Sequence, residues 1–129
     1  MSEHALVGEL REAGQDFEWY PTTRRMVDAV VADLKDVGGD EHRSVLDIGA
    51  GDGRVLMWLG ESLDRATLYS IEKSTILQQR QPDRIIPVGT EFIEQDLMSL
   101  PVDVVFCNPP YSSFLEWAYR IITTAHAHV

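Results

Sequence analysis

Apolar residues recur along this chain in two patterns, helical stripes and short continuous runs. Stripes on one helix face, together with capping residues, predict helices over residues 2–13, 22–37, 54–63, 74–81 and 113–129. Short runs rich in β-branched residues predict strands over 44–48, 66–72 and 102–106, and alternation of apolar and polar residues predicts one more over 91–95. Strands and helices that alternate in this way are typical of an α/β domain with a parallel sheet.

Capping and chain-breaking residues set the expected ends of these elements. The first helix is expected to begin at Ser2, and the second at Thr22 or Thr23. The second helix is expected to end at Gly38-Gly39, because glycine readily adopts the left-handed conformation that closes a helix. Residues 84–89 contain a proline and a glycine, so they predict a loop with at most a short edge strand.

The composition is that of one acidic domain. The chain has 129 residues, 44% of them hydrophobic, with a net charge of −10 and a pI near 4.6. No apolar run is long enough to cross a bilayer and no signal-peptide pattern opens the chain, so we expect a cytoplasmic protein without a membrane partner. The single cysteine, Cys107, excludes an internal disulfide and a cysteine-cluster metal site, and we expect no metal. Basic residues are adjacent only at Arg24-Arg25, which is unusual for a protein that contacts phosphates.

A glycine-rich loop follows the first predicted strand. Glycine stands at every second position, at Gly49, Gly51 and Gly53, directly after Asp47 and Ile48 at the end of the strand. Glycine allows positive φ and lets the backbone approach a ligand, because it has no Cβ. The G-x-G-x-G spacing departs from the dinucleotide fingerprint G-x-G-x-x-G. The alternative is a generic strand-turn-helix connection.

Acidic residues end two of the later predicted strands. In nucleoside-binding sheets the second strand ends in an acid, roughly 20 residues after the glycine-rich loop, that binds the ribose hydroxyls. Glu72 ends the strand over 66–72, and its two carboxylate oxygens suit two hydroxyls on adjacent carbons. Asp96 closes the strand predicted over 91–95, and capping of a helix or turn is its alternative role.

The last predicted strand runs into the motif Asn108-Pro109-Pro110-Tyr111, whose prolines end the strand. The carboxyl end of a buried strand is where open α/β sheets bind ligands. The Asn108 side-chain oxygen and the Pro109 carbonyl could both accept hydrogen bonds from an NH₂ group, and Tyr111 offers a face for stacking. An ordinary proline-rich turn is the alternative. The motif therefore suits a planar ligand that carries an exocyclic amine.

Asn-Pro-Pro-Tyr resembles the catalytic motif of the class I S-adenosylmethionine (SAM)-dependent amino-methyltransferases. The resemblance implies that Asn108, Pro109, Pro110 and Tyr111 are catalytic. This group includes adenine-specific DNA and RNA methyltransferases and the enzymes that methylate a glutamine side chain in release factors. The glycine-rich loop beside Asp47 resembles the SAM-binding loop of the same group, which implies SAM as the cofactor.

The resemblance covers about residues 20–111 and implies further contacts to the cofactor. Tyr20-Pro21-Thr22 resembles the aromatic-Thr-Pro element that contacts the methionine end of SAM, with proline and threonine in reversed order; a hydrophobic staple and helix cap is the alternative. Asp96 and the Leu97 backbone N–H are implied to bind the cofactor's adenine, and Lys73 to flank it. The implied cofactor-binding residues are Tyr20, Thr22, Asp47, Gly49, Gly51, Gly53, Glu72, Lys73, Asp96, Leu97 and Asn108.

The implied fold is a partial Rossmann-like SAM-methyltransferase fold, with a parallel sheet ordered 3-2-1-4 and helices on both faces. Residues 1–39 are expected to form an N-terminal helical segment with an aromatic loop, and residues 40–129 the SAM-binding core. The family's complete fold continues with further strands that this sequence lacks. The helix over 113–129 would then expose apolar surface, so we expect a fragment, a homodimer or a partner subunit that completes the fold.

The implied activity is SAM-dependent methylation of the exocyclic amino group of adenine in DNA or RNA. Two alternatives stay open. A protein-glutamine methyltransferase would use the same Asn108 geometry on a side-chain amide and suits an acidic chain better. A truncated, non-catalytic SAM-binding module that acts in a complex would bind the cofactor without turnover.

Overall fold

A computed structural model of the chain describes residues 2–17, 19–38, 42–63 and 65–129. The helices are α1 (Glu3–Glu12), α2 (Arg24–Asp36), α3 (Arg54–Ser62), α4 (Thr75–Gln79) and α5 (Phe114–Thr124), and the strands are β1 (Ser44–Ile48), β2 (Thr67–Ile71), β3 (Ile85–Gly89) and β4 (Val104–Cys107). Short 3₁₀ helices are η2 (Phe92–Glu94), η3 (Leu97–Ser99) and η4 (Tyr111–Ser113). Gly39, expected to help end the second helix, and the domain boundary expected between residues 39 and 40 lie outside the described residues.

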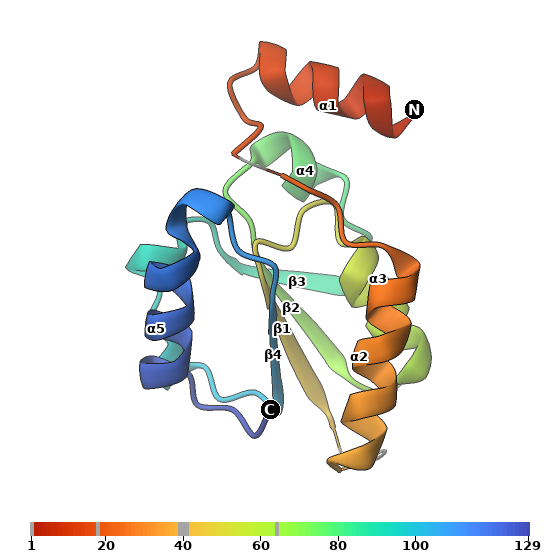
Figure 1. Ribbon diagram of the computed structural model, residues 1–129, viewed down its shortest axis with the longest axis vertical. Helices are drawn as coiled ribbons and strands as arrows, with labels where there is room; N and C mark the ends of the chain where they lie inside the picture. Colours follow the sequence, from red (N-terminus) through yellow and green to blue (C-terminus); the bar gives the residue numbers. More distant parts are fainter. Residues whose placement is uncertain (1, 18, 39–41, 64) are drawn as a thin grey trace.

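The sheet has four strands in the order β3-β2-β1-β4, which is the order 3-2-1-4 that the family resemblance implies. Strand β1 pairs with β2 on one side and β4 on the other, and both pairings are parallel. Residues 45–48 of this strand are all buried, and its apolar side chains Val45, Leu46 and Ile48 lie on both faces of the sheet, as in a strand covered on both sides. Because all four strands point the same way, β1, β2 and β4 bring their carboxyl ends to one end of the molecule (Figure 1).

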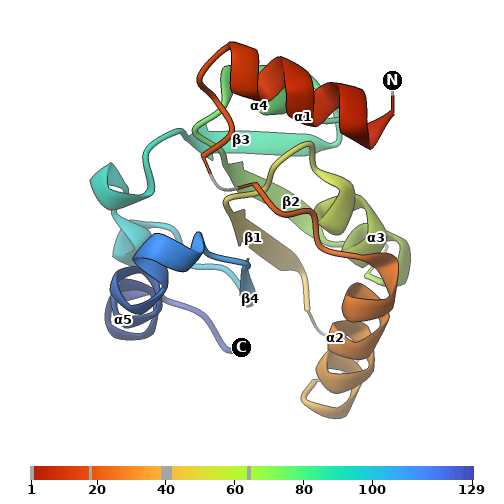
Figure 2. The ribbon, with the colours of Figure 1, turned by 45° about the horizontal axis from the view of Figure 1, so that its top comes forward.

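Helices cover both faces of the sheet, as expected. Helices α2 and α3 lie on one face and α5 lies on the other (Figures 1 and 2). Successive side chains of a strand point to opposite faces, so β1 contributes Val45 to the core under α2 and α3, and Leu46 and Ile48 to the core under α5. Leu46 is fully enclosed there, and burying such a side chain stabilises the fold by about 1.5–3 kcal/mol.

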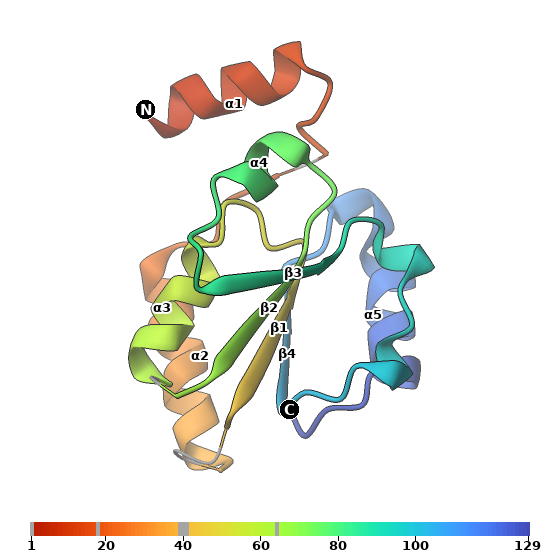
Figure 3. The ribbon, with the colours of Figure 1, turned by 180° about the vertical axis from the view of Figure 1, so that it is seen from behind.

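The N-terminal helix α1 packs against α4 beyond the ends of β1 and β2 (Figure 3). Leu6 and Leu10 of α1 form a small core with Leu77 of α4. Ser2 caps the helix as predicted, because its hydroxyl accepts a hydrogen bond from the Ala5 N–H at 3.2 Å. This packing fixes the point from which the following segment, described over residues 13–17 and 19–22, leads toward α2.

The predicted strand over 91–95 is wrong, and the third strand is β3, which precedes it. Apolar and polar residues alternate over 91–95 although this segment contains a 3₁₀ turn, which buries Phe92 and exposes Ile93. Strand β3 lies at the edge of the sheet and pairs only with β2, so it tolerates Pro87, whose missing N–H weakens a strand in the interior of a sheet.

The predicted helix over 113–129 ends early, at Thr124. The chain then turns back along the start of β4, where the Val102 N–H donates to the His126 carbonyl at 3.1 Å and the Val105 N–H to the Val129 carbonyl at 2.9 Å. The expectation of exposed apolar surface on this helix is confirmed, because its outer side presents Phe114, Leu115, Tyr119 and Ile122 to solvent. None of the helices in the described part of the chain has the length and apolarity to span a bilayer.

Candidate functional site

A cavity of about 330 Å³ opens at the carboxyl ends of β1, β2 and β4. The loop after β3, the start of α5 and the segment before α2 complete its walls. Eight residues that the sequence singles out line it, and they come from four separate parts of the chain: Tyr20, Thr22, Asp47, Gly49, Glu72, Lys73, Asn108 and Pro110. The sheet topology thus brings residues that are far apart in sequence into one site.

The glycine-rich loop needs its glycines for conformation and for space. Gly49, Gly51 and Gly53 have φ values of +79°, +60° and +86°, a region that other residues rarely adopt. A Cβ on Gly51 would lie 2.6 Å from Nε1 of Trp19, and one on Gly53 would lie 2.5 Å from the Ile85 side chain. Gly51 and Gly53 do not line the cavity themselves. They shape the turn that leads from Asp47 into α3.

Glu72 is held at the end of β2 by backbone hydrogen bonds. One carboxylate oxygen accepts from the Gly51 N–H at 2.6 Å and the other from the Ser74 N–H at 2.8 Å. Burial raises the pKa of Glu72 and outweighs these hydrogen bonds, which lower it. The side chain is therefore fixed in one orientation on the cavity wall, where its remaining lone pairs can accept hydrogen bonds from a ligand.

Asp47 is a buried carboxyl group on the cavity wall, at the carboxyl end of β1. Only 2% of the residue is exposed, and among the described residues no hydrogen-bond donor reaches its side chain. Burial, together with the nearby charge of Glu72, raises the pKa of Asp47 to about 8. A cationic ligand group beside this carboxylate would supply the missing partner and favour its ionised form.

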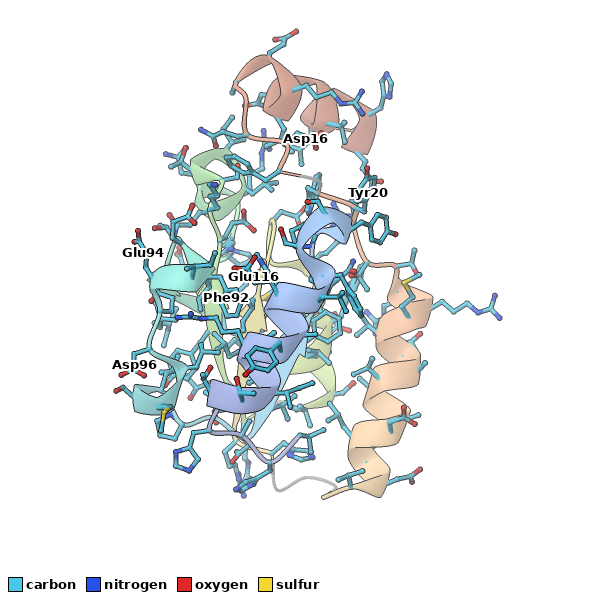
Figure 4. All side chains as sticks on the ribbon, turned by 60° about the vertical axis from the view of Figure 1, so that its left-hand side comes forward. Asp16, Tyr20, Phe92, Glu94, Asp96 and Glu116 are labelled. Carbon is cyan, nitrogen blue, oxygen red and sulfur yellow. The ribbon has the colours of Figure 1, made fainter. Side chains whose placement is uncertain are left out.

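Asn108 joins the Asn-Pro-Pro-Tyr motif to the segment before α2 that carries Phe17, Trp19 and Tyr20, here called the aromatic segment. Its side-chain Nδ2 donates to the Tyr20 carbonyl and to Oγ1 of Thr22, each at 3.2 Å. The Tyr20 ring stacks on Tyr111, with ring centroids 5.2 Å apart and planes 21° apart. Tyr111 does not line the cavity and lies at its mouth with most of its ring exposed. Figure 4 shows Tyr20 beside the start of α5.

The aromatic segment forms a wall of the cavity. Phe17, Trp19 and Tyr20 all line it. Gln15 anchors the segment, because its side-chain oxygen accepts hydrogen bonds from the Ser74 hydroxyl at 2.8 Å and from the Ile76 N–H at 3.1 Å. The three aromatic rings therefore have a defined place across the ends of the strands.

No known family model matches the chain. The release factor glutamine methyltransferase of Flavobacterium psychrophilum is 26% identical over 103 residues, which cover 74% of this chain and 36% of that protein. The plantazolicin methyltransferase BpumL, solved with a triazolic substrate analog and SAH, superimposes with a TM-score of 0.66 at 16% identity, over 95% of this chain and 48% of that one. A human methyltransferase 10 domain containing protein gives 0.62 at 24% identity, over 93% of this chain and 66% of that one.

The chain has the Rossmann-like methyltransferase fold. It spans about half or less of the length of the glutamine methyltransferase and of BpumL, so it corresponds to part of those proteins. The part it holds contains the glycine-rich loop, the acid after β2 and the motif after β4. In this methyltransferase fold the cavity described above lies where β1, β2 and β4 end.

Asp96 and Leu97 are not in the cavity, which corrects the placement expected from the sequence. The error follows from the misplaced third strand. Asp96 instead caps η3, where it accepts hydrogen bonds from the Met98 N–H at 3.1 Å and from the Ser99 hydroxyl. Figure 4 shows Asp96 at the outer edge of its loop, away from Tyr20, whereas Phe92 lies toward α5.

The residues that occupy the expected place of Asp96 are Thr90 and Glu91, which directly follow β3 and line the cavity. Glu91 forms an ion pair with Lys73 at 3.1 Å. Sequence reasoning missed them because Pro87 argued against a strand over 85–89, although Ile85, Ile86 and Val88 are β-branched. The β-branched run was the signal that could have found them.

Pro109, the remaining predicted residue, does not line the cavity, although its neighbours in sequence do. It fixes the chain between Asn108 and Pro110, both of which do line it. The described part of the chain contains no group of three or more His, Cys, Asp or Glu residues arranged to hold a metal ion.

Proposed function

We propose that this chain binds SAM in the cavity and methylates the exocyclic amino group of adenine in DNA or RNA. The observation that carries the proposal is the arrangement at Asn108. Both N–H groups of its amide are used within the protein, so its oxygen is left to accept a hydrogen bond from an amine at the cavity mouth. The exposed Tyr20–Tyr111 pair beside it offers a stacking surface for a base.

The cavity residues suit the parts of SAM. Asp47, without a hydrogen-bond partner in the described chain, would hold the ammonium group of the methionine part. Glu72, fixed by the backbone at the end of β2, would accept from the two ribose hydroxyls. Phe92 and Ile93 offer apolar surface for the adenine ring, and Glu91 lies beside them. The residues present therefore fit the cofactor that the methyltransferase fold implies.

When bound, SAM supplies an electrophilic methyl group on a sulfonium. Asn108 and the Pro109 carbonyl would accept hydrogen bonds from the amine and aim its lone pair into the cavity. Methyl transfer would form an N–C bond as the C–S bond breaks, and the amine would then lose one proton to solvent. The contribution of the protein is orientation, because the reaction needs no covalent intermediate on the enzyme.

A second acceptor, the side-chain amide of glutamine in a protein, is favoured by two observations. The chain is similar to a release factor glutamine methyltransferase at 26% identity, and its net charge of −10 disfavours contact with phosphates. A glutamine amide presents the same planar NH₂ group to Asn108, so the same geometry would serve it.

Tritiated SAM tests the proposal with three acceptors: adenine-containing DNA, adenine-containing RNA, and a glutamine-containing peptide. We expect label in a nucleic acid, lost when its adenines already carry N6-methyl groups. Label in the peptide alone would show that the acceptor is a glutamine side chain and not adenine. Cofactor binding without label in any acceptor would favour a non-catalytic module, and absence of SAM binding would overturn the proposal. Asn108→Ala is the control, which should bind SAM without transferring methyl groups.

A further inference from the structure

The orientation of the Asn108 amide can be assigned from its neighbours. The oxygen and nitrogen of an asparagine side chain are interchangeable unless the hydrogen bonds decide between them. The Tyr20 carbonyl can only accept, so the atom 3.2 Å from it is the amide nitrogen. The second N–H of the same nitrogen meets Oγ1 of Thr22, also at 3.2 Å. The amide oxygen has no partner among the described residues and is therefore the acceptor offered to a substrate.

Thr22 is well placed to keep this orientation. It is 8% exposed, whereas its neighbour Thr23 is exposed. The two threonines also have separate contacts. Thr23 caps α2 by accepting from the Met26 N–H at 3.4 Å, and the Thr22 hydroxyl meets Asn108. A structural reason for a hydroxyl before α2 is therefore supplied by Thr23 alone.

We infer that Thr22 is a positioning residue, whose hydroxyl holds the Asn108 amide so that its oxygen faces the amine to be methylated. The inference rests on the proposed methyl transfer and concerns the acceptor side of the site. It differs from the role that the sequence resemblance implies for this threonine, a contact with the methionine end of SAM. The two roles make different predictions for loss of the Thr22 hydroxyl: unchanged SAM affinity if it positions Asn108, and weaker SAM affinity if it contacts the cofactor.

Nuclear magnetic resonance of the side-chain amide tests the contact without any turnover. In ¹⁵N-labelled protein, the Asn108 NH₂ pair is identified by its disappearance in Asn108→Ala. We expect its protons to exchange slowly with water in the wild type and in Thr22→Ser, and quickly in Thr22→Val. Thr23→Val is the matched control, because it removes a helix cap from the adjacent threonine and leaves the Asn108 contact in place. Equal exchange in wild type and Thr22→Val would overturn the inference.

Kinetics then separate the two roles of Thr22. We expect Thr22→Val to lower kcat about tenfold, the rate equivalent of one ordinary hydrogen bond, with the Kd for SAM unchanged and activity restored in Thr22→Ser. Weaker SAM binding with an unchanged kcat would assign Thr22 to the cofactor and overturn the inference. If the wild type methylates no acceptor, the proposed function fails, while the exchange of the Asn108 amide protons still decides whether Thr22 orients it.

Discussion

Because of Asp47, the stability of this protein should fall as pH rises, whereas a carboxylate whose pKa is lowered on folding makes stability rise with pH. Its pKa is raised from 3.8 to about 8, because the group is buried and lies near Glu72. The folded protein therefore keeps this proton up to about pH 8, whereas the unfolded chain loses it near pH 4. Between these values the folded state binds the extra proton, so its stability falls as pH rises and the loss is complete above pH 8.

The size of the effect follows from the shift. Each pKa unit corresponds to 1.36 kcal/mol, so a shift of about four units removes about 5 kcal/mol of stability across this pH range. That is a large part of the 5–15 kcal/mol that holds a typical domain together. The pKa of Glu72 is also raised by burial and acts in the same direction. Asp47→Asn keeps the shape of the side chain and cannot ionise, so it should be the more stable protein at alkaline pH.

Urea unfolding followed by far-ultraviolet circular dichroism measures this at a series of pH values from about 5 to about 9. We expect the free energy of unfolding of the wild type to fall by several kcal/mol over the series, and that of Asp47→Asn to fall much less, with Glu72 responsible for the remainder. Asp33→Asn, which changes an exposed carboxylate on α2, is the control and should follow the wild type. The same pH dependence in wild type and Asp47→Asn would refute the reasoning.

Three further predictions concern the fold and the acceptor site. Gly51→Ala should lower the free energy of unfolding by about 1–3 kcal/mol in urea, because of its φ of +60° and the nearby Trp19, whereas Gly8→Ala, in the open face of α1, should not lower it. Leu46→Ala should cost about 2–5 kcal/mol in the same assay and Leu115→Ala almost nothing, since the first is enclosed and the second is exposed; equal costs would contradict the assigned core. Tyr111→Ala should raise the acceptor KM about tenfold, the loss of one stacked base, and leave SAM affinity unchanged. An unchanged acceptor KM would show that Tyr111 does not bind the acceptor.

The sequence predicts the strand ends well where two local signals coincide. A short, mainly apolar run followed within two residues by glycines or prolines marks the ends of β1 and β4, and thereby Asp47, the glycine-rich loop and Asn108. Glu72 follows from its spacing after the loop. These are local features of the chain, so one sequence is enough to find them.

The sequence predicts less well where tertiary contacts decide the structure. Pro87 argued against a strand and was tolerated because β3 is at the edge of the sheet. The buried Phe92 lies in a 3₁₀ turn, but with the polar residues around it the sequence alternates as a strand does. The third strand was therefore predicted too late in the chain, and Asp96 was expected at its end. The hydrogen bond from Asn108 to Thr22 joins residues 86 positions apart, and no local pattern reports it.

Calorimetric titration with SAM tests most directly whether the carboxyl ends of these strands form a cofactor site beside an acceptor site. Wild-type protein should bind one SAM per chain, and Glu72→Gln should weaken binding about tenfold, as expected for a lost charge-assisted hydrogen bond. Asn108→Ala should bind SAM as the wild type does, since Asn108 serves the acceptor. No binding by the wild type, or equal weakening by both substitutions, would contradict this division of the site.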